Sequence, residues 1–284
     1  MNCTGHAALQ ATIPPRKHDG MANDSKTLTS PAIELRNVEF RLAEHVILKR
    51  LSLEAQRGET LVLLGRSGSG KTTALKLMNR LQEPTAGDVY VDGQSALEWD
   101  PIRLRRHIGY VIQESGLFPH FTVERNVALV PHLENWDEIR TSERVRELLR
   151  LVGLEPSQFA RRYPYELSGG QRQRVGVARA LAADPPILLM DEPFGSLDLL
   201  TRVEIQQEFH ALQRKMRKTV VFVTHDVSEA LLLATRIALM EAGELKGVYT
   251  PEEFLRSNEP IAAAYVSALR AAIVQQFPEK RGVQ

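Results

Sequence analysis

Eight consecutive residues, GRSGSGKT at 65–72, combine three glycines with a lysine and a threonine. They fit the pattern G-x-x-x-x-G-K-[ST], in which backbone N–H groups curl around the phosphates of a nucleotide. In that arrangement Lys71 would reach the β- and γ-phosphates, and the Thr72 hydroxyl would bind Mg²⁺. The sequence therefore predicts a loop that binds ATP together with Mg²⁺. Its residues would be Gly65, Arg66, Ser67, Gly68, Ser69, Gly70, Lys71, Thr72 and Thr73.

Two adjacent carboxylates supply the second part of this chemistry. Asp191 follows the apolar run 187–190, which is typical of a parallel strand buried on both faces. Open α/β sheets bind their ligands at the carboxyl ends of such strands. We therefore predict Asp191 as a Mg²⁺ ligand and Glu192, the next residue, as the general base that activates the attacking water.

His225 follows another apolar run, 220–224, within the sequence VTHD. A single histidine after a strand is usually structural. Here its spacing from Asp191 and Glu192 matches a set of nucleotide-handling motifs, so we predict that His225 contacts the γ-phosphate and the carboxylate of Glu192.

The secondary structure that must position these residues is a buried α/β core. The loop at 65–72 follows a strand at 60–64 and precedes a helical pattern at 73–81, which is the context of a P-loop. Further strands are predicted at 33–40, 48–54, 88–91 and 108–112. A covering helix is predicted between 197 and 217. An amphipathic helix at 137–151, with Ile139, Val145, Leu148 and Leu149 on one side, belongs to a helical insertion at about 115–165.

The octapeptide LSGGQRQR at 167–174 resembles the signature sequence of the ATP-binding cassette transporters. From the residues alone, Ser168 can cap a helix that runs to about Ala183, whose N-terminus would favour a γ-phosphate. The resemblance implies an α/β fold of the P-loop NTPase class, with a RecA-like core, an antiparallel β edge and a helical subdomain. It also implies a head-to-tail homodimer with two ATP molecules at its interface.

In such a dimer each ATP would be held by the P-loop of one subunit and the signature residues of the other. These are Ser168, Gly169, Gly170 and Gln171. The resemblance assigns Gln113, after the run 108–112, as a γ-phosphate sensor that touches Mg²⁺ and water. It places Ser196 and Asp198 in the loop that crosses the dimer interface.

One position departs from the family pattern. The family usually stacks adenine on an aromatic residue just before the second strand, and the matching residue here is Leu42, between Phe40 and His45. Two hypotheses follow. Adenine binding is weaker or is assisted by a neighbour, or Leu42 packs on adenine as an apolar residue.

A closer resemblance extends from about residue 33 to 256. Three stretches resemble the ATPase subunits of importers for quaternary amines such as glycine betaine, choline and carnitine: ALKLMNRLQEPTAGDVYVDG, DPIRLRRHIGYVIQESGLFPHFTVERNVALVP and RYPYELSGGQRQRVGVARALAADPPILLMDEPFGSLD. In that family the surface formed by GLFPHFTVERN, 116–126, receives the coupling helix of the membrane permease. Thr122 is predicted to cap a helix there, and Phe118 and Phe121 are predicted to be exposed.

The resemblance therefore implies three protein partners: a second ATPase subunit, a permease and, through the permease, an extracytoplasmic solute-binding protein. Other small-solute importers, for amino acids or sulfonates, remain an alternative. A soluble ATP-driven switch in DNA repair or translation is a second alternative, although such relatives generally carry two cassettes or long coiled coils. Many relatives append a pair of regulatory domains, and we expect none here because the chain is too short.

Composition limits the remaining possibilities. The chain has 284 residues, 43% of them hydrophobic, but no stretch of 18 apolar residues, so we predict no membrane span and no secretory signal. Its one cysteine, Cys3, fits a reducing cytoplasm. A net charge of +1 indicates no nucleic-acid partner. We therefore expect a peripheral protein at the cytoplasmic face of the inner membrane.

The chain is predicted to have three parts. Residues 1–30 form a disordered tail, within which Met21 is a second possible start. Residues 31–257 form the ATPase domain. Residues 258–284 form a short helical extension.

Overall fold

The structure is a computed structural model that describes residues 30–113, 116–195, 197–216 and 218–276. The predicted N-terminal tail, the predicted interface residue Ser196 and the end of the C-terminal extension lie outside these ranges. All that follows concerns the unit that begins at Pro31.

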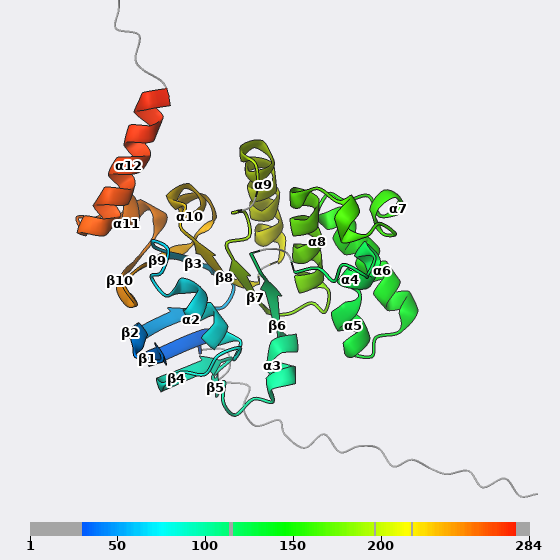
Figure 1. Ribbon diagram of the computed structural model, residues 1–284, viewed down its shortest axis with the longest axis horizontal. Helices are drawn as coiled ribbons and strands as arrows, with labels where there is room; N and C mark the ends of the chain where they lie inside the picture. Colours follow the sequence, from blue (N-terminus) through cyan, green and yellow to red (C-terminus); the bar gives the residue numbers. More distant parts are fainter. Residues whose placement is uncertain (1–29, 114–115, 196, 217, 277–284) are drawn as a thin grey trace, which may run out of the picture. The chain divides into compact units, whose positions relative to one another are not determined.

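A six-stranded sheet with the order β10-β9-β3-β8-β7-β6 forms the centre of this unit (Figure 1). Its strands are β3 (Thr60–Leu64), β6 (Ile108–Val111), β7 (Ile187–Asp191), β8 (Thr219–Thr224), β9 (Arg236–Glu241) and β10 (Glu244–Tyr249). All neighbours are parallel except β10, which pairs antiparallel with β9. Strands β3, β7 and β8 are buried along their whole length. The predicted strands of this sheet are confirmed to within one residue at each end.

Alternate residues of these strands face two different cores, as the two-residue period of a strand requires. In β3, Val62 and Leu64 pack with the helices, whereas Leu61 and Leu63 pack toward the second sheet. The apolar runs of the sequence therefore fill both sides of the sheet.

The second sheet has four antiparallel strands in the order β2-β1-β4-β5. They are β1 (Ile33–Leu42), β2 (His45–Ala55), β4 (Ala86–Val91) and β5 (Gln94–Ser95). Strands β1 and β2 run longer than predicted because Leu42 pairs with His45 across a tight turn. The backbone of Ala43 in that turn has a positive φ of 51°.

Helices cover the six-stranded sheet and extend beyond β6 (Figure 1). They are α2 (Lys71–Met78), α3 (Pro101–His107), α4 (Val123–Val127), α5 (Leu129–Leu133), α6 (Glu138–Leu151), α7 (Pro156–Phe159), α8 (Gly169–Leu181), α9 (Leu199–Met216), α10 (Val227–Leu233), α11 (Pro251–Arg256) and α12 (Pro260–Gln276), with a 3₁₀ turn at Pro164–Glu166. Helices α4 to α8 gather beside β6, as Figure 1 shows.

Helix α6 begins where its sequence predicts, because the Asp137 side chain accepts a hydrogen bond from the Arg140 N–H. Val145, Leu148 and Leu149 are buried as expected. The prediction for Ile139 was wrong, since its side chain is 74% exposed. Ile139 lies in the first turn of α6, before the buried face begins.

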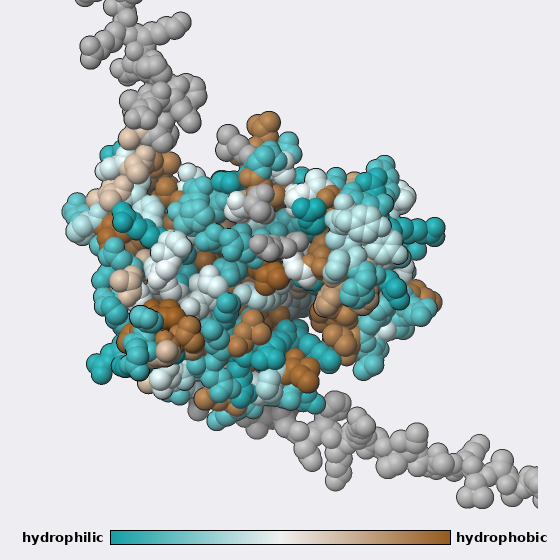
Figure 2. Space-filling model, viewed as in Figure 1, coloured by the Kyte–Doolittle hydropathy of each residue, from teal (hydrophilic) through white to brown (hydrophobic). Residues whose placement is uncertain are grey.

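Among the described residues, no helix is both long enough and apolar enough to cross a membrane. The exposed hydrophobic side chains visible in Figure 2 are interspersed with hydrophilic ones.

Candidate functional site

The predicted phosphate loop connects β3 to α2, so the strand, loop and helix context is confirmed. Gly68 and Gly70 have φ values of 80° and 95°, which other residues adopt only with strain. A side chain at Gly70 would also collide with Leu48 and the backbone of Ile47. Glycine is therefore required where the loop turns into the helix.

Lys71 extends back along this loop. Its ammonium group donates hydrogen bonds to the carbonyl oxygens of Gly65 and Arg66, at 2.7 and 2.8 Å. Burial lowers the pKa of Lys71, while the nearby carboxylates of Glu192 and Asp191 oppose that change. Because the side chain is 5% exposed, its charge is held at a defined point under the loop.

The Thr72 hydroxyl and the Asp191 carboxylate meet at the carboxyl end of β7. The hydroxyl donates to Asp191 Oδ1 over 2.8 Å. Burial raises the pKa of Asp191, and the Thr72 hydrogen bond opposes that rise. Mg²⁺ is commonly held by one or two protein oxygens together with substrate phosphates, rather than by a full protein cage. This pair of oxygens fits that requirement, although no group of three or more His, Cys, Asp or Glu within the described ranges could hold a metal.

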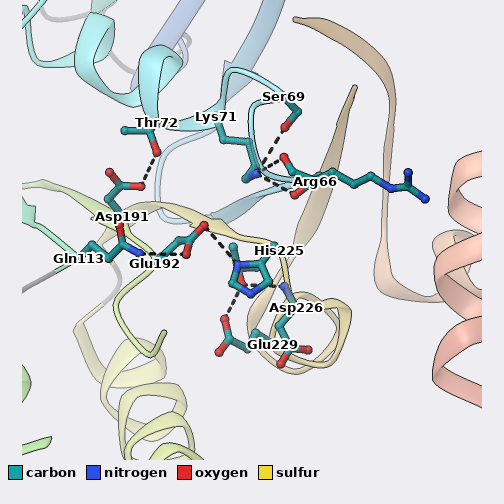
Figure 3. A network of polar contacts seen from close by, with 12 residues as sticks. Arg66, Ser69, Lys71, Thr72, Gln113, Asp191, Glu192, His225, Asp226 and Glu229 are labelled. Atoms are coloured by element: carbon teal, nitrogen blue, oxygen red, sulfur yellow. Dashed lines mark hydrogen bonds and ion pairs between the residues drawn. The ribbon is translucent and has the colours of Figure 1, made fainter. Parts of the chain in front are cut away.

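Glu192 comes directly after β7, and both of its carboxylate oxygens are contacted. Gln113 Nε2 donates to Oε2 over 3.3 Å, and His225 Nδ1 lies 3.3 Å from Oε1. Figure 3 shows these three side chains converging below the loop that carries Lys71. The structure thus brings together the predicted base and both of the residues predicted to act beside it.

The backbone of Glu192 has a φ of 42°, in the left-handed region that costs energy for a non-glycine residue. Its N–H donates to the Val223 carbonyl of β8, and its own carbonyl accepts from the Gly195 N–H. These bonds hold the residue in the strained conformation and turn its side chain toward the loop.

The signature residues form the start of α8. The Ser168 hydroxyl accepts from the Gln171 N–H, and the Gln171 side chain accepts in return from the Ser168 N–H. Ser168 therefore caps the helix as predicted, and α8 ends at Leu181, two residues before the predicted end. Gly169 and Gly170 form its first turn. Within the part of the chain that the structure describes, no hydrogen bond or ion pair joins these residues to the phosphate loop.

Asp198 precedes α9, and its carboxylate accepts a hydrogen bond from the Thr201 N–H over 3.1 Å. Hydrogen bonds from Thr201 lower the pKa of Asp198. This exposed carboxylate therefore caps the helix.

Residues 48–195 match the family model described as ABC transporter, a range that includes the phosphate loop, Glu192 and the signature residues but ends before Asp198 and His225. The chain belongs to the ABC transporter family. The nucleotide of this cassette is accordingly ATP.

Two curated relatives illustrate the similarity. The glycine betaine/carnitine/choline transport ATP-binding protein OpuCA of Bacillus subtilis is 55% identical over 207 residues, which are 73% of this chain and 54% of that protein. The osmoprotectant import ATP-binding protein OsmV of Salmonella typhimurium is 46% identical over 230 residues, 81% of this chain and 59% of OsmV. The cassette thus spans little more than half the length of these relatives.

Among solved structures, the dimeric bacterial ABC transporter cassette MJ0796 is similar with a TM-score of 0.70 and 38% identity. The match covers 77% of this chain and 98% of MJ0796. The predicted fold, a P-loop cassette with an antiparallel β edge and a helical subdomain, is confirmed.

Leu42 lies at the end of β1 in this cassette, with 62% of its surface exposed. Its neighbour Phe40 is 8% exposed and belongs to the core between the sheets, so it cannot present a ring to a base. His45 is exposed opposite Leu42. Of the two flanking residues, Phe40 and His45, the structure therefore leaves only His45 exposed beside Leu42.

The segment at 116–126 is held by one buried residue that the sequence analysis did not single out. Asn126 is fully buried; it accepts from the Phe118 N–H and donates to the carbonyls of Phe118 and Phe121. Thr122 caps α4, as predicted. Phe118 is 41% exposed, but Phe121 is partly buried, so the prediction that both rings are exposed holds for Phe118 alone.

A second buried polar residue that the sequence analysis missed is Glu229 in α10. It is 4% exposed and lies four residues after His225. The available signal was an acidic residue among the apolar residues that follow VTHD. One of its hydrogen-bond partners is Thr224 of VTHD, but the other, Gln206, comes from another helix and could not be read from local spacing.

Proposed function

We propose that this chain is the ATP-hydrolysing subunit of an importer, with a quaternary amine such as glycine betaine, choline or carnitine as the solute. The observation that carries the hydrolytic part is the placement of Glu192 between Gln113 and His225, beside Lys71 and Asp191. The solute class is supported by the names of relatives such as OpuCA and OsmV.

In this proposal the backbone of the phosphate loop and Lys71 bind the β- and γ-phosphates and offset their negative charge. Thr72, Asp191 and Gln113 would hold Mg²⁺, which supplies further positive charge at the same oxygens. Glu192 holds the attacking water in line with the γ-phosphate and accepts a proton from that water. His225 contacts the γ-phosphate and keeps the Glu192 carboxylate in position.

The second half of each ATP site comes from another copy of the chain. Ser168, Gly169, Gly170 and Gln171 would face the γ-phosphate across a head-to-tail homodimer, with Ser196 and Asp198 at the same interface. The N-terminus of α8 suits this role, because its first N–H groups and its helix dipole favour an anion. The relative MJ0796, whose cassette is dimeric, supports this arrangement.

The dimer would act on a membrane permease, which in turn receives solute from an extracytoplasmic binding protein. We place the chain at the cytoplasmic face of the cell membrane, held there by the permease. The exposed Phe118 and the loop that Asn126 shapes are the proposed contact. ATP binding closes the dimer and hydrolysis reopens it, and this motion is what the permease uses.

The proposal is tested by uptake of labelled glycine betaine, choline and carnitine into cells that hold the complete importer. Three versions of this subunit are compared: wild type, Glu192→Gln and Glu98→Gln. Glu98 is an exposed carboxylate remote from the motifs, so its variant controls for the loss of one charge. We expect uptake with wild type and Glu98→Gln and none with Glu192→Gln.

Two other outcomes would change the proposal. Absence of quaternary amine uptake with the wild type would move the solute to another class, such as amino acids or sulfonates, and leave the ATPase proposal in place. Equal uptake with wild type and Glu192→Gln would contradict the assigned role of Glu192.

A further inference from the structure

A buried carboxylate lies behind His225. Glu229 Oε2 accepts a hydrogen bond from the Thr224 hydroxyl over 2.6 Å, and Oε1 accepts from Gln206 Nε2 over 3.0 Å. Burial raises the pKa of Glu229, and these two hydrogen bonds oppose that rise. A buried carboxylate is costly unless its oxygens are hydrogen-bonded. Here each oxygen has one defined donor.

The Thr224 hydroxyl has a second contact that involves the backbone next to His225. It accepts a hydrogen bond from the Asp226 N–H over 3.0 Å. His225 therefore lies between Thr224 and Asp226, which are joined by this hydrogen bond. The same Thr224 hydroxyl donates to Glu229. The Asp226 side chain in turn caps α10 by accepting from the Ser228 N–H over 2.7 Å.

The imidazole of His225 is fixed by packing much less than the buried Glu229 side chain is. Its side chain is 59% exposed, and its contact in the site is the 3.3 Å approach of Nδ1 to Glu192. For such an exposed ring, the direction in which the backbone presents it decides whether it meets Glu192. The bonds of Thr224 bear on that direction, because they fix the backbone on both sides of His225. Figure 3 shows Glu229 and Asp226 beside His225.

We propose that Glu229 is a positioning residue of the hydrolytic site, which acts through the Thr224 hydroxyl to hold His225 against Glu192. This inference rests on the proposed ATPase function. It assigns Glu229 no contact with ATP or water. Its effect is on the geometry of a neighbouring side chain, where a displacement of about 1 Å can lower a rate by about 100-fold.

The same network reaches the helix that starts at the proposed dimer interface. Gln206 belongs to α9, and Arg202, one turn earlier, lies 3.8 Å from the Asp226 carboxylate. Arg202 also donates to the carbonyl of Leu197, just before Asp198. Helix α9 therefore contacts the residues that follow His225 at two points, Asp226 and Glu229. A shift of the first turn of α9 would displace these residues and with them His225.

The central experiment compares two threonine-to-valine changes in β8, in the full-length chain. Thr224→Val removes the hydroxyl that joins Glu229 to the Asp226 N–H. Thr219→Val, at the other end of the strand, removes an equally buried hydroxyl that accepts from the Gly58 N–H over 3.0 Å. Thr224→Val loses two hydrogen bonds and Thr219→Val loses one. We expect kcat for ATP hydrolysis to fall about 10-fold or more in Thr224→Val alone, with KM for ATP within about twofold.

A second readout does not depend on activity. The ring signal of His225 can be followed by NMR with labelled histidine, assigned by its loss in His225→Ala. We expect this signal to move in Thr224→Val and in Glu229→Met, and to stay in place in Thr219→Val. Glu229→Gln should restore the signal and the rate, because its amide oxygen can still accept from Thr224.

The inference is overturned if Thr224→Val keeps the wild-type kcat and His225 signal, or if Thr219→Val shows the same losses. If Thr224→Val does not fold, the comparison of Glu229→Met with Glu229→Gln decides, and equal behaviour of these two overturns it. A wild-type chain without ATP turnover would contradict the proposed function, and the His225 signal would still test the positioning role.

Discussion

The phosphate loop and the start of the signature helix differ in how far one chain organises them. Around the loop, Lys71, Thr72 and Asp191 are tied to each other or to the loop by short hydrogen bonds, and Lys71 and Asp191 are buried. At the start of α8, the Ser168 and Gln171 side chains each accept from the other residue's N–H, and Ser168 is exposed. One half of the proposed ATP site is thus organised within this chain, and in our proposal the other half acts on a second copy.

In the proposed function, this difference would let ATP hydrolysis be coupled to motion. The rigid half keeps its groups in place for binding and chemistry. The exposed half would contribute only when two chains close on ATP, so that ATP would favour one of two arrangements.

The largest expected effect is on the rigid half. Glu192→Gln keeps the size of the side chain but removes the base, so we expect ATP hydrolysis to fall by about 10²- to 10⁴-fold. ATP binding should persist, and the variant should accumulate as an ATP-bound dimer in size-exclusion chromatography. Steady-state phosphate release measures the rate, with Glu98→Gln as control. Near wild-type turnover would remove Glu192 from its role.

A complementation experiment tests whether the exposed half acts across the dimer. Lys71→Ala should destroy the P-loop of its own chain, and Ser168→Arg should block the signature that it presents. Each homodimer should then lack both sites. A heterodimer of the two variants retains one complete site, formed by the P-loop of one chain and the signature of the other. We expect purified heterodimers to regain phosphate release that neither homodimer shows.

The control for that experiment is a single chain that carries both changes, mixed with wild type. Its heterodimer has one defective half in each site, so activity should not exceed that of the wild-type homodimers present. If the two separate variants fail to complement each other, the signature does not act on the P-loop of the partner.

The local structure of both halves could be predicted from the sequence. Motifs such as 65–72 and 167–171 specify local geometry, a turn into a helix and a cap, and the structure reproduces both. Long buried strands were also predictable because an apolar run such as 187–190 has few alternatives inside an α/β core. Spacing alone therefore placed Asp191 and Glu192 at a strand end.

What the sequence did not reveal depends on contacts distant along the chain. Short elements such as α3, α5 and α10 have too few residues to be stable by themselves and form because the core holds them. The hydrogen bond between Gln206 and Glu229 joins residues 23 apart on two helices. The positive φ of Glu192 is supported by β8 rather than by its own neighbours.

A smaller effect is expected at the adenine end of the rigid half. Leu42→Tyr places an aromatic ring at an exposed position where this family usually stacks the base. Stacking contributes about 1–3 kcal/mol, so the Kd for ATP should fall about fivefold or more. Fluorescence titration with a labelled ATP analogue measures it, with Leu42→Met as an apolar control. Unchanged affinity in Leu42→Tyr would favour packing of Leu42 itself on adenine.

The smallest expected effect is on the stability of the fold. It compares Asp191, beside the phosphate loop, with the exposed Asp198. Burial raises the pKa of Asp191 above its usual value of 3.8, so its charged form destabilises the fold, increasingly as pH rises through that pKa. Without ATP and Mg²⁺, Asp191→Asn should therefore be more stable than wild type by about 1 kcal/mol at pH 8, and the gain should disappear toward pH 4.

The exposed Asp198 should behave in the opposite way. Hydrogen bonds from Thr201 lower its pKa, so its charged form stabilises the fold above pH 4, and that contribution is lost as pH falls. Asp198→Asn should thus lower the melting temperature at pH 8 and have little effect near the acid limit. We expect the change in melting temperature relative to wild type to rise with pH from 4 to 8 for Asp191→Asn. For Asp198→Asn we expect it to fall over the same range. Slopes of the same sign would show that the two carboxylates share one environment, and the contrast between the halves would fail.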